Sequence, residues 1–319
     1  MVRDCALRVA RYSPPLPMMS GLLRTMRPHQ WVKNLPVLAP VVFALHLFDT
    51  GVALRALAGF GVFCILVGAV YVLNDLVDVE ADRLHPVKKN RPIASGQLTV
   101  AQAKIACAAL ATIALAGSLA LGWAFLGAAL GYFLLNVAYS FKLKNIAYLD
   151  VLCIAAGFEL RVLAGSFAAQ VPPSAYLLLC MGLAAAFLGL GKRSHELAVM
   201  ELKAAKGEKG AGGEKKTETR KALGGYHPRV LAPLLYACGA ATLVTYVVYT
   251  LDPDTIAAFG TSWLVGSAVF AAIGLGRFVW LVQRKTTAES PTDAMLRDPP
   301  FLASLASWGL AVVLILYFT

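Results

Sequence analysis

Nine long apolar stretches, separated by short polar or charged segments, constrain the fold of this chain more than any other feature. An α-helix needs about 20 apolar residues to cross the hydrocarbon core of a bilayer. The mean hydropathy of +0.66 and the charged fraction of only 15% argue against a soluble enzyme, in which about a quarter of the residues are charged. We therefore predict an all-α polytopic membrane protein with nine transmembrane helices, at about 35–50, 54–76, 101–121, 123–140, 147–169, 174–190, 229–250, 261–282 and 301–318.

The basic residues indicate how these helices are oriented. If nine helices alternate, 26 of the 29 Lys and Arg residues fall on one side of the membrane, in the segments 1–34, 80–104, 141–146, 192–229 and 283–300. Positively charged loops remain on the cytoplasmic side. We therefore predict a location in the cell membrane, with a cytoplasmic N-terminus and an external C-terminus. This asymmetry also accounts for the net charge of +11, so nucleic-acid binding is not expected.

The predicted domain organisation is simple. A cytoplasmic tail over 1–23 precedes one transmembrane domain over 24–319. Within that domain, residues 201–221 are rich in Gly, Lys and Glu and are predicted to be a mobile cytoplasmic loop. Five of the six cysteines lie inside apolar stretches and none has a Cys-x-x-Cys spacing, so neither a disulfide framework nor a cysteine metal site is expected.

Three carboxylates lie at the end of the second apolar stretch and just after it. Asp75, Asp78 and Asp82 are spaced i, i+3, i+7, which places them on one face of a helix. Like charges so close together repel one another, and a divalent cation between them relieves the repulsion. Such oxygen ligands suit Mg²⁺, which bridges to substrate phosphates. The alternative is a solvated acidic face, which is unexpected in a loop on the positively charged side of the membrane.

Basic residues follow the carboxylates within the same loop, at Lys88, Lys89 and Arg91. Carboxylates that hold a metal, beside bases that neutralise further oxygens, form a site suited to a diphosphate. The alternative interpretation is that these bases only contribute to the positive charge of a cytoplasmic loop.

A second polar cluster surrounds the start of the fifth apolar stretch. It contains Tyr139, Lys144 and Asp150, with Arg161 eleven residues beyond Asp150. Arg161 should therefore lie roughly 16 Å deeper along the same helix face. An arginine at that depth needs a polar cavity or an acidic partner, so the choice between a substrate contact and an interhelical ion pair stays open. Lys33, Lys192 and Arg193 add basic residues at the predicted cytoplasmic ends of other helices.

The sequence resembles the UbiA superfamily of intramembrane prenyltransferases. The resemblance rests on Asn74-Asp75-x-x-Asp78-x-x-x-Asp82-Arg83 and Arg91-Pro92-x-x-x-Gly96 in a chain with nine predicted spans. It implies a helical bundle with a cytoplasmic mouth, Mg²⁺ on the aspartates as cofactor, and a lateral opening for a polyprenyl chain. A second DxxxD motif, usual in the aromatic prenyltransferases of this superfamily, is reduced here to Asp150, because Ile154 stands four residues on.

The details resemble the decaprenyl-phosphate phosphoribosyltransferase branch of that superfamily. The matching segments are Arg27-Pro28-x-Gln30-Trp31-Val32-Lys33-Asn34, the Asp75 motif, Asp150 to Arg161, and Gly191-Lys192-Arg193-x-x-Glu196. This resemblance implies transfer of the 5-phosphoribosyl group from phosphoribosyl diphosphate (PRPP) to a polyprenyl phosphate such as decaprenyl phosphate, for synthesis of a cell-wall arabinan precursor.

The resemblance also implies roles for the candidate residues. Asp75, Asp78 and Asp82 would hold Mg²⁺ and Asn74 would orient them. Asp150 would stabilise an oxocarbenium-like transition state. The substrate phosphates would be held by the remaining candidates: Lys33, Lys88, Lys89, Arg91, Tyr139, Lys144, Arg161, Lys192 and Arg193.

Two other functions stay open at this point. One is a UbiA-type prenyltransferase that uses a polyprenyl diphosphate and an aromatic acceptor. The other is a secondary transporter, although the charges cluster at helix ends and no internal repeat is evident. The sequence also leaves homo-oligomerisation and the prenyl chain length open.

Overall fold

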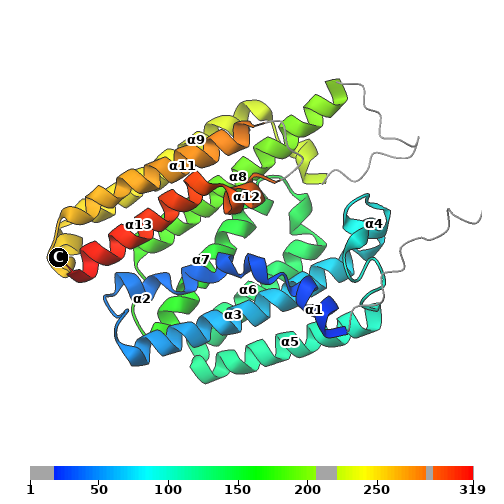
Figure 1. Cartoon of the computed structure of the whole chain (residues 1–319), viewed down its shortest axis with the longest axis horizontal. Coiled ribbons are helices and arrows are strands. Elements are labelled where there is room, and N and C mark those ends of the chain that lie inside the picture. The colour runs from blue at the N-terminus through cyan, green and yellow to red at the C-terminus, as the bar shows by residue number, and fades with distance from the viewer. Residues whose placement is uncertain (1–17, 206–220, 285–289, 319) are drawn as a thin grey trace, which may run out of the picture. The chain divides into compact units, whose positions relative to one another are not determined.

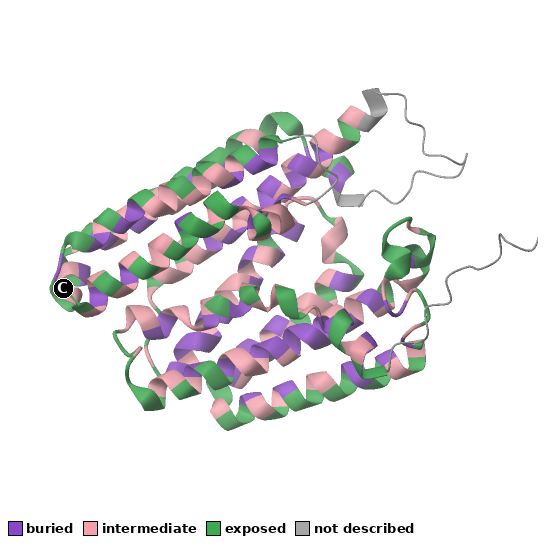
Figure 2. Cartoon of the chain, in the orientation of Figure 1, coloured by how far each residue is buried: buried purple, intermediate pink, exposed green. Residues whose placement is uncertain are grey.

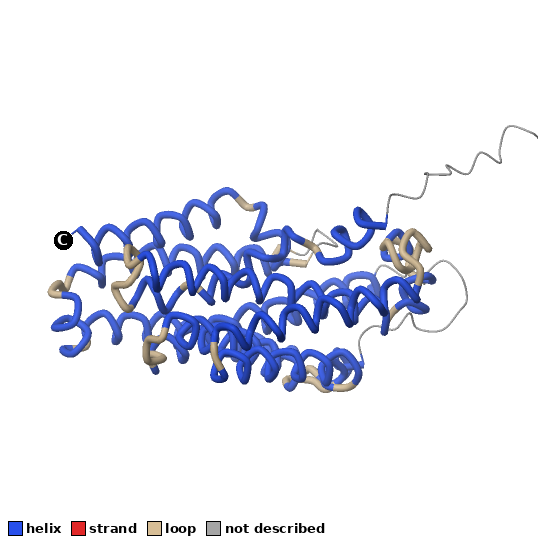
Figure 3. The backbone as a smooth tube through the Cα atoms, turned by 90° about the horizontal axis from the view of Figure 1, so that it is seen from below, coloured by secondary structure: helices blue, strands red, loops and turns tan. Residues whose placement is uncertain are grey.

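The computed structural model of the chain describes residues 18–205, 221–284 and 290–318, and these residues form helices and loops without a strand (Figure 3). Eight helical segments in the described part of the chain are long and apolar enough to cross a membrane. They confirm the prediction of an all-α, multi-pass membrane protein. The orientation of the spans stays a prediction.

The chain forms two compact units. Unit 1 comprises Met1–Lys33 and Gly61–Gly117, and unit 2 comprises Asn34–Phe60 and Ser118–Thr319. Two long helices, α3 (Thr50–Val77) and α5 (Val100–Leu121), contribute residues to both. That residues 24–319 act as one catalytic domain therefore stays a prediction.

Unit 1 is organised around the carboxyl-terminal part of α3. It also contains α1, the start of η1, α4, η2 and most of α5; the bounds are Met18–Met26, Pro28–Val37, Val79–Leu84, Lys88–Asn90 and Val100–Leu121 (Figure 1). Val72, Ile93 and Leu98 form a core against which Leu22 packs. At the start of α5, Thr99 and Gln102 each accept a hydrogen bond from the other's backbone N–H, at 3.2 and 3.0 Å. This reciprocal cap fixes where α5 begins.

Unit 2 contains the remaining helices. They are α2 (Ala39–Phe43), α6 (Trp123–Phe141), η3 (Leu143–Asn145), α7 (Leu149–Ala169), α8 (Ala175–Ala205), η4 (Lys221–Gly225), α9 (Pro228–Leu251), α10 (Pro253–Phe259), η5 (Trp263–Ser267), α11 (Ala268–Gln283), α12 (Pro291–Ala294), η6 (Met295–Arg297) and α13 (Pro299–Phe318). Helix α7 packs between α6 and α8, α8 packs against α9, and α11 lies beside α13 (Figure 1).

The packing of α7 against the segment before α2 requires a glycine. A Cβ atom on Gly165 would lie 2.0 Å from the backbone oxygen of Val37. Two backbones can approach this closely only where no side chain intervenes. Gly165 thus fixes the position of the Val37 backbone on α7, next to the segment that carries Asn34.

Large apolar side chains lie on the outside of several spans. Only 22% of the apolar window of α5 and 17% of that of α13 is buried, and Figure 2 shows many exposed residues along both helices. Ile105 is 71% exposed and Trp123 is 77% exposed. Exposed apolar surface of this extent is unfavourable in water but compatible with a bilayer.

The first predicted span, at about 35–50, is not one long helix. The described chain forms the 3-10 helix η1 and the five-residue helix α2 there, and no long span. Pro36 lies inside η1 and Pro40 at the start of α2. Each proline lacks an N–H donor and its ring collides with the preceding turn, and these two prolines, four residues apart, interrupt the α-helix here.

Two predicted segments are partly helical. Helix α1 begins at Met18, so residues 18–23 of the predicted tail form helix. Helix α8 continues through residues 201–205, because Glu201, Leu202 and the residues up to Ala205 are good helix formers. Residues 206–220 of the predicted loop and 1–17 of the predicted tail lie outside the described residues.

Candidate active site

The acidic residues of unit 1 lie where α3 passes into α4. Helix α3 ends at Val77, and Asp78 stands at the junction before α4. The i→i−4 hydrogen bonding continues across this junction, from Asp78 N–H to the Asn74 oxygen at 3.0 Å and from Asp82 N–H to the Asp78 oxygen at 2.8 Å. The path is therefore nearly helical, and Asp75 and Asp82 lie on its buried side, each 2% exposed.

Two arginines neutralise these buried carboxylates. Arg91 Nη1 lies 3.1 Å from Asp75 Oδ1 and 2.6 Å from Asp82 Oδ2. Arg27 Nη2 donates to Asp75 Oδ1 at 2.7 Å, and its guanidinium lies 4.8 Å from the centre of the Tyr71 ring. Arg27 was not among the residues predicted for the site. It has a backbone φ of 53°, so the chain turns sharply just where this side chain enters the cluster.

The other bases of unit 1 contribute unequally. Lys88 Nζ lies 4.0 Å from Asp82 Oδ1, at the limit of an ion pair. Lys89 is exposed and Lys33 is half-buried. His85 Nδ1 accepts hydrogen bonds from the backbone N–H groups of Val87 and Lys88, at 3.1 and 3.2 Å. Desolvation, followed by the charge of Lys88, lowers the pKa of His85 and keeps that nitrogen free to accept.

The predicted three-carboxylate metal site is only partly assembled. No group of three or more metal-ligating side chains is gathered among the residues that the structure describes. Asp75 and Asp82, however, both reach one cationic nitrogen of Arg91, and Asp78 is close enough to interact electrostatically with Asp75. Mg²⁺ in proteins is held by one or two carboxylates together with substrate phosphates. The donor set therefore fits Mg²⁺.

A second charged cluster lies within unit 2, at the start of α7. Asp150 is fully buried, and Arg193 on α8 is 1% exposed. Asp150 Oδ2 and Arg193 Nε are 2.7 Å apart. The N–H is not aimed well enough at the oxygen for an aligned hydrogen bond, so the contact is mainly one of charge. Arg193 Nη1 also pairs with Glu196, one turn further along α8.

Tyr226 completes this cluster from the segment before α9. Its hydroxyl donates to Asp150 Oδ1, which also accepts from the Val151 N–H at 2.9 Å. Burial and the hydrogen bond to Asp150 raise the pKa of Tyr226, so the hydroxyl keeps its proton and remains a donor. Neither Tyr226 nor Glu196 was among the residues predicted for the site.

The remaining candidates of unit 2 fall into two places. Tyr139 is half-buried and interacts electrostatically with Arg193, and Lys144 and Lys192 are half-buried as well. Arg161 is instead held by neutral acceptors: Asn34 Oδ1 at 2.9 Å, the Gly157 oxygen at 2.8 Å and the Tyr132 hydroxyl at 2.9 Å.

Arg161 carries its charge without a carboxylate partner in the described part of the chain. Besides the three hydrogen bonds, its guanidinium lies 4.6 Å from the Tyr132 ring centre and 5.1 Å from that of Phe158. The interhelical ion pair left open by the sequence is therefore absent among these residues. A buried cation stabilised only by dipoles and rings remains attractive to an anion.

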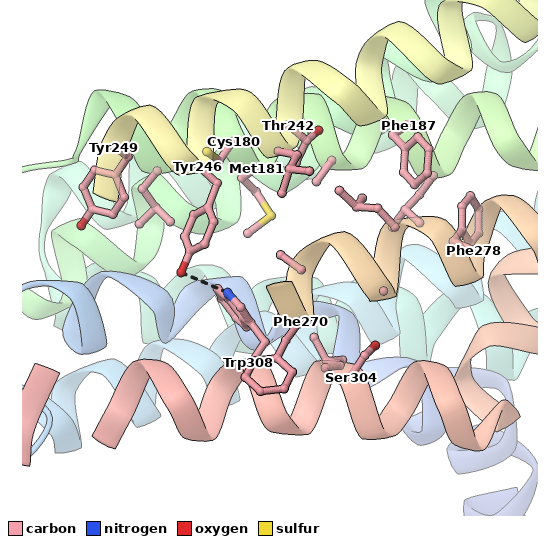
Figure 4. A pocket seen from close by; sticks show the side chains of 18 of the residues that line it. Cys180, Met181, Phe187, Thr242, Tyr246, Tyr249, Phe270, Phe278, Ser304 and Trp308 are labelled. Carbon is pink, nitrogen blue, oxygen red and sulfur yellow. Dashed lines mark hydrogen bonds between the residues drawn. The ribbon is translucent and has the colours of Figure 1, made fainter. Parts of the chain in front are cut away.

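An apolar cavity of about 270 Å³ lies between α8, α9, α11 and α13 in unit 2 (Figure 4). Aromatic side chains form much of its wall, among them Phe187, Tyr249 and Trp308. Trp308 Nε1 donates to the Tyr246 hydroxyl at 3.1 Å, the contact drawn as a dashed line in Figure 4. The cavity therefore suits an apolar ligand with few polar groups.

Comparison with known proteins decides the family. Residues 35–202 match the model of the UbiA prenyltransferase family. The chain belongs to this family. A decaprenyl-phosphate phosphoribosyltransferase from Mycolicibacterium smegmatis is 31% identical over 94% of this chain and 94% of its own length. A protein of the same name from Corynebacterium glutamicum is 30% identical over 95% of this chain and 89% of its own length.

The fold of a UbiA-family protein is also evident from a solved structure. A UbiA homologue from Archaeoglobus fulgidus bound to DMAPP and Mg²⁺ superimposes with a TM-score of 0.68, over 92% of this chain and 99% of that one. At 21% sequence identity, this likeness shows that the two chains share a fold.

Proposed function

We propose that this UbiA-family protein transfers the 5-phosphoribosyl group of PRPP to the phosphate of decaprenyl phosphate or a similar polyprenyl phosphate. The products are a polyprenylphosphoryl 5-phosphoribose and diphosphate. The observation that carries this proposal is the likeness, over nearly the whole chain, to proteins named decaprenyl-phosphate phosphoribosyltransferase. We propose that the cell uses this product in the synthesis of a cell-wall arabinan precursor.

The charges of the described site support an anionic substrate pair. PRPP carries a diphosphate and a 5-phosphate, and the lipid acceptor carries a third phosphate group. Each compact unit contains buried or half-buried bases, with Arg27 and Arg91 in unit 1 and Arg161 and Lys192 in unit 2. A neutral aromatic acceptor would not need this many cations.

Asp75 and Asp82, with Asp78 beside them, are the residues that would hold Mg²⁺. Bound there, the ion would neutralise charge on the leaving diphosphate. Arg91 already reaches both carboxylates and can donate to diphosphate oxygens from the same position. The acceptor phosphate is ionised at neutral pH, so no residue has to remove a proton from it. Asn74 would orient the neighbouring carboxylates.

The burial of Asp150 changes the role we assign to it. A carboxylate with no exposed surface that already contacts Arg193 and Tyr226 is poorly placed to face a ribosyl cation. We propose instead that Asp150 and Arg193 position each other as a buried pair, and that the half-buried Lys192, Tyr139 and Lys144 form a basic surface for substrate phosphate. Lys33, Lys88 and Lys89 would serve the same purpose in unit 1.

The apolar cavity of unit 2 would accept part of the isoprenoid chain of the lipid. Ala184→Phe on α8 fills space that Ala184 now leaves open to the cavity. We expect this variant to raise the KM for polyprenyl phosphate at least about fivefold, because a large side chain there costs roughly 1–3 kcal/mol of steric accommodation. PRPP binding should be unchanged.

Ala124→Phe is the matched control, because Ala124 is exposed on α6 and should tolerate the larger ring. Steady-state kinetics with each substrate varied in turn would measure the effect. Equal KM values for the lipid in both variants would contradict the placement of the isoprenoid chain in this cavity.

The donor itself can be tested by binding. With Mg²⁺ and a hundredfold excess of PRPP over its dissociation constant, the free energy of unfolding should rise by about 2.7 kcal/mol. Chelating the metal should remove most of this stabilisation, because carboxylates alone repel a diphosphate. Thermal unfolding in detergent, with and without EDTA, measures both effects. If PRPP stabilised the protein equally with and without EDTA, the metal assignment would be overturned. If PRPP gave no stabilisation at all, its assignment as the donor would be overturned.

A further inference from the structure

Arg277 on α11 and Arg284, which directly follows this helix, contact the same tryptophan ring in unit 2. The guanidinium carbon of Arg277 lies 3.7 Å from the centre of the Trp280 ring, and that of Arg284 lies 4.0 Å from it. Arg277 and Trp280 lie three residues apart on one face of α11, and Arg284 follows the end of the helix with an extended backbone. Trp280 is 37% exposed and Arg284 is exposed, so the cluster is open to its surroundings.

The two arginines differ in how their charge is balanced. Arg277 makes a bidentate contact with Asp298, with its Nε at 3.0 Å and its Nη2 at 2.8 Å from the two carboxylate oxygens. The hydrogen bond from Arg277 lowers the pKa of Asp298, which therefore stays ionised. Arg284 contacts Trp280 but forms no ion pair within the described ranges. Asp298 also interacts electrostatically with Arg284, so among these three described side chains two guanidinium groups share one carboxylate and one positive charge remains.

The depth of the cluster relative to a bilayer points to the kind of anion. By length and composition, the apolar span that contains α11 ends at Gln283, and we therefore expect Arg284 to lie where the hydrocarbon region meets the headgroups. Gln283 Nε2 donates to the Tyr236 hydroxyl of α9 at 3.0 Å, and Tyr236 is 50% exposed. Tyrosine, tryptophan and arginine are the side chains that favour this depth.

We propose that Arg284 and Trp280 form a binding site for the headgroup phosphate of an anionic phospholipid. The net positive charge of Arg277, Asp298 and Arg284 matches the single negative charge of a phosphodiester. The indole face holds the Arg284 guanidinium in place, and Gln283 and Tyr236 offer further polar atoms beside it. The site is independent of the transfer reaction, because none of its residues belongs to the candidate active site.

The test is native mass spectrometry of the full chain, delipidated in detergent and then incubated with phosphatidylglycerol or with phosphatidylcholine. We expect wild type to retain phosphatidylglycerol preferentially, and Arg284→Gln to lose about fivefold in apparent affinity for it, since one basic residue near a charged membrane surface contributes about 1 kcal/mol. Trp280→Leu should reduce the preference as well. The melting temperature of each variant would verify that it is folded.

Arg229→Gln is the matched control. Arg229 is exposed at the start of α9 and makes no ring contact among the described residues, and its substitution removes the same charge. Equal binding by wild type and Arg284→Gln, or an equal loss in both arginine variants, would overturn the proposal. So would displacement of the lipid by millimolar inorganic phosphate, which would indicate a site for a free anion.

Discussion

Asp75→Asn and Asp82→Asn should each lower turnover at least about a hundredfold while the protein stays folded. Both carboxylates are buried and both reach Arg91. Asparagine keeps the shape and one acceptor oxygen but removes the charge that a divalent cation needs, and loss of a metal ligand or of its orientation costs activity on this scale.

Glu80→Gln is the matched control for these variants. Glu80 lies in the same segment, but its side chain is 79% exposed and pairs with Arg83 at the surface. The Glu80→Gln variant should therefore retain a turnover close to that of wild type. Initial rates at saturating Mg²⁺, compared with thermal unfolding of each variant, separate a catalytic loss from a folding defect. Normal turnover in Asp75→Asn or Asp82→Asn would show that these carboxylates hold no essential metal.

Arg193→Met should destabilise the protein by about 3–5 kcal/mol. The substitution leaves Asp150, which is fully buried, without its cationic partner, and an uncompensated buried charge is costly on this scale. The double variant Asp150→Asn/Arg193→Met should recover part of the loss, because it leaves neither charge alone in the interior. Denaturant titration in detergent measures the free energy of unfolding.

Arg83→Met provides the comparison, because the Arg83–Glu80 ion pair is exposed and such pairs contribute at most about 1 kcal/mol. If Arg193→Met and the double variant were equally unstable, the loss would come from side-chain packing. In that case the positioning of Arg193 by Asp150 would have no support from stability.

Much of the fold could be predicted from hydrophobic patterning, because a membrane span is a local property of about 20 consecutive residues. Eight of the predicted spans coincide with long apolar helices of the described chain. The prediction of a first span at about 35–50 was wrong because it rested on average hydrophobicity, which takes no account of the helix-interrupting Pro36 and Pro40. The predicted start of the loop at residue 201 was wrong as well. The charged residues there suggested a loop, whereas Glu201 and Leu202 extend a helix that is already formed.

The same distinction between local and long-range features applies to the candidate site. The spacing of Asp75 and Asp82 is local, and the structure buries both on one side of a nearly helical path. The partners come from distant parts of the sequence: Arg27 reaches Asp75 across 48 residues, and Tyr226 reaches Asp150 across 76. A single sequence does not reveal which distant residues pair. For this reason the sequence alone predicts a substrate contact for Arg193, whereas in the structure its partners are Asp150 and Glu196.

The identity of the donor is tested most directly by the product. The purified chain would be incubated with Mg²⁺, PRPP and polyprenyl phosphate, and in parallel with Mg²⁺, polyprenyl diphosphate and an aromatic acid, followed by mass spectrometry of the lipids. We expect a polyprenyl phosphate heavier by one phosphoribosyl group, with release of diphosphate, in the first reaction and no product in the second. A prenylated aromatic acid in the second reaction, without phosphoribosylated lipid in the first, would contradict the phosphoribosyl transfer and leave the membership of the UbiA family unchanged.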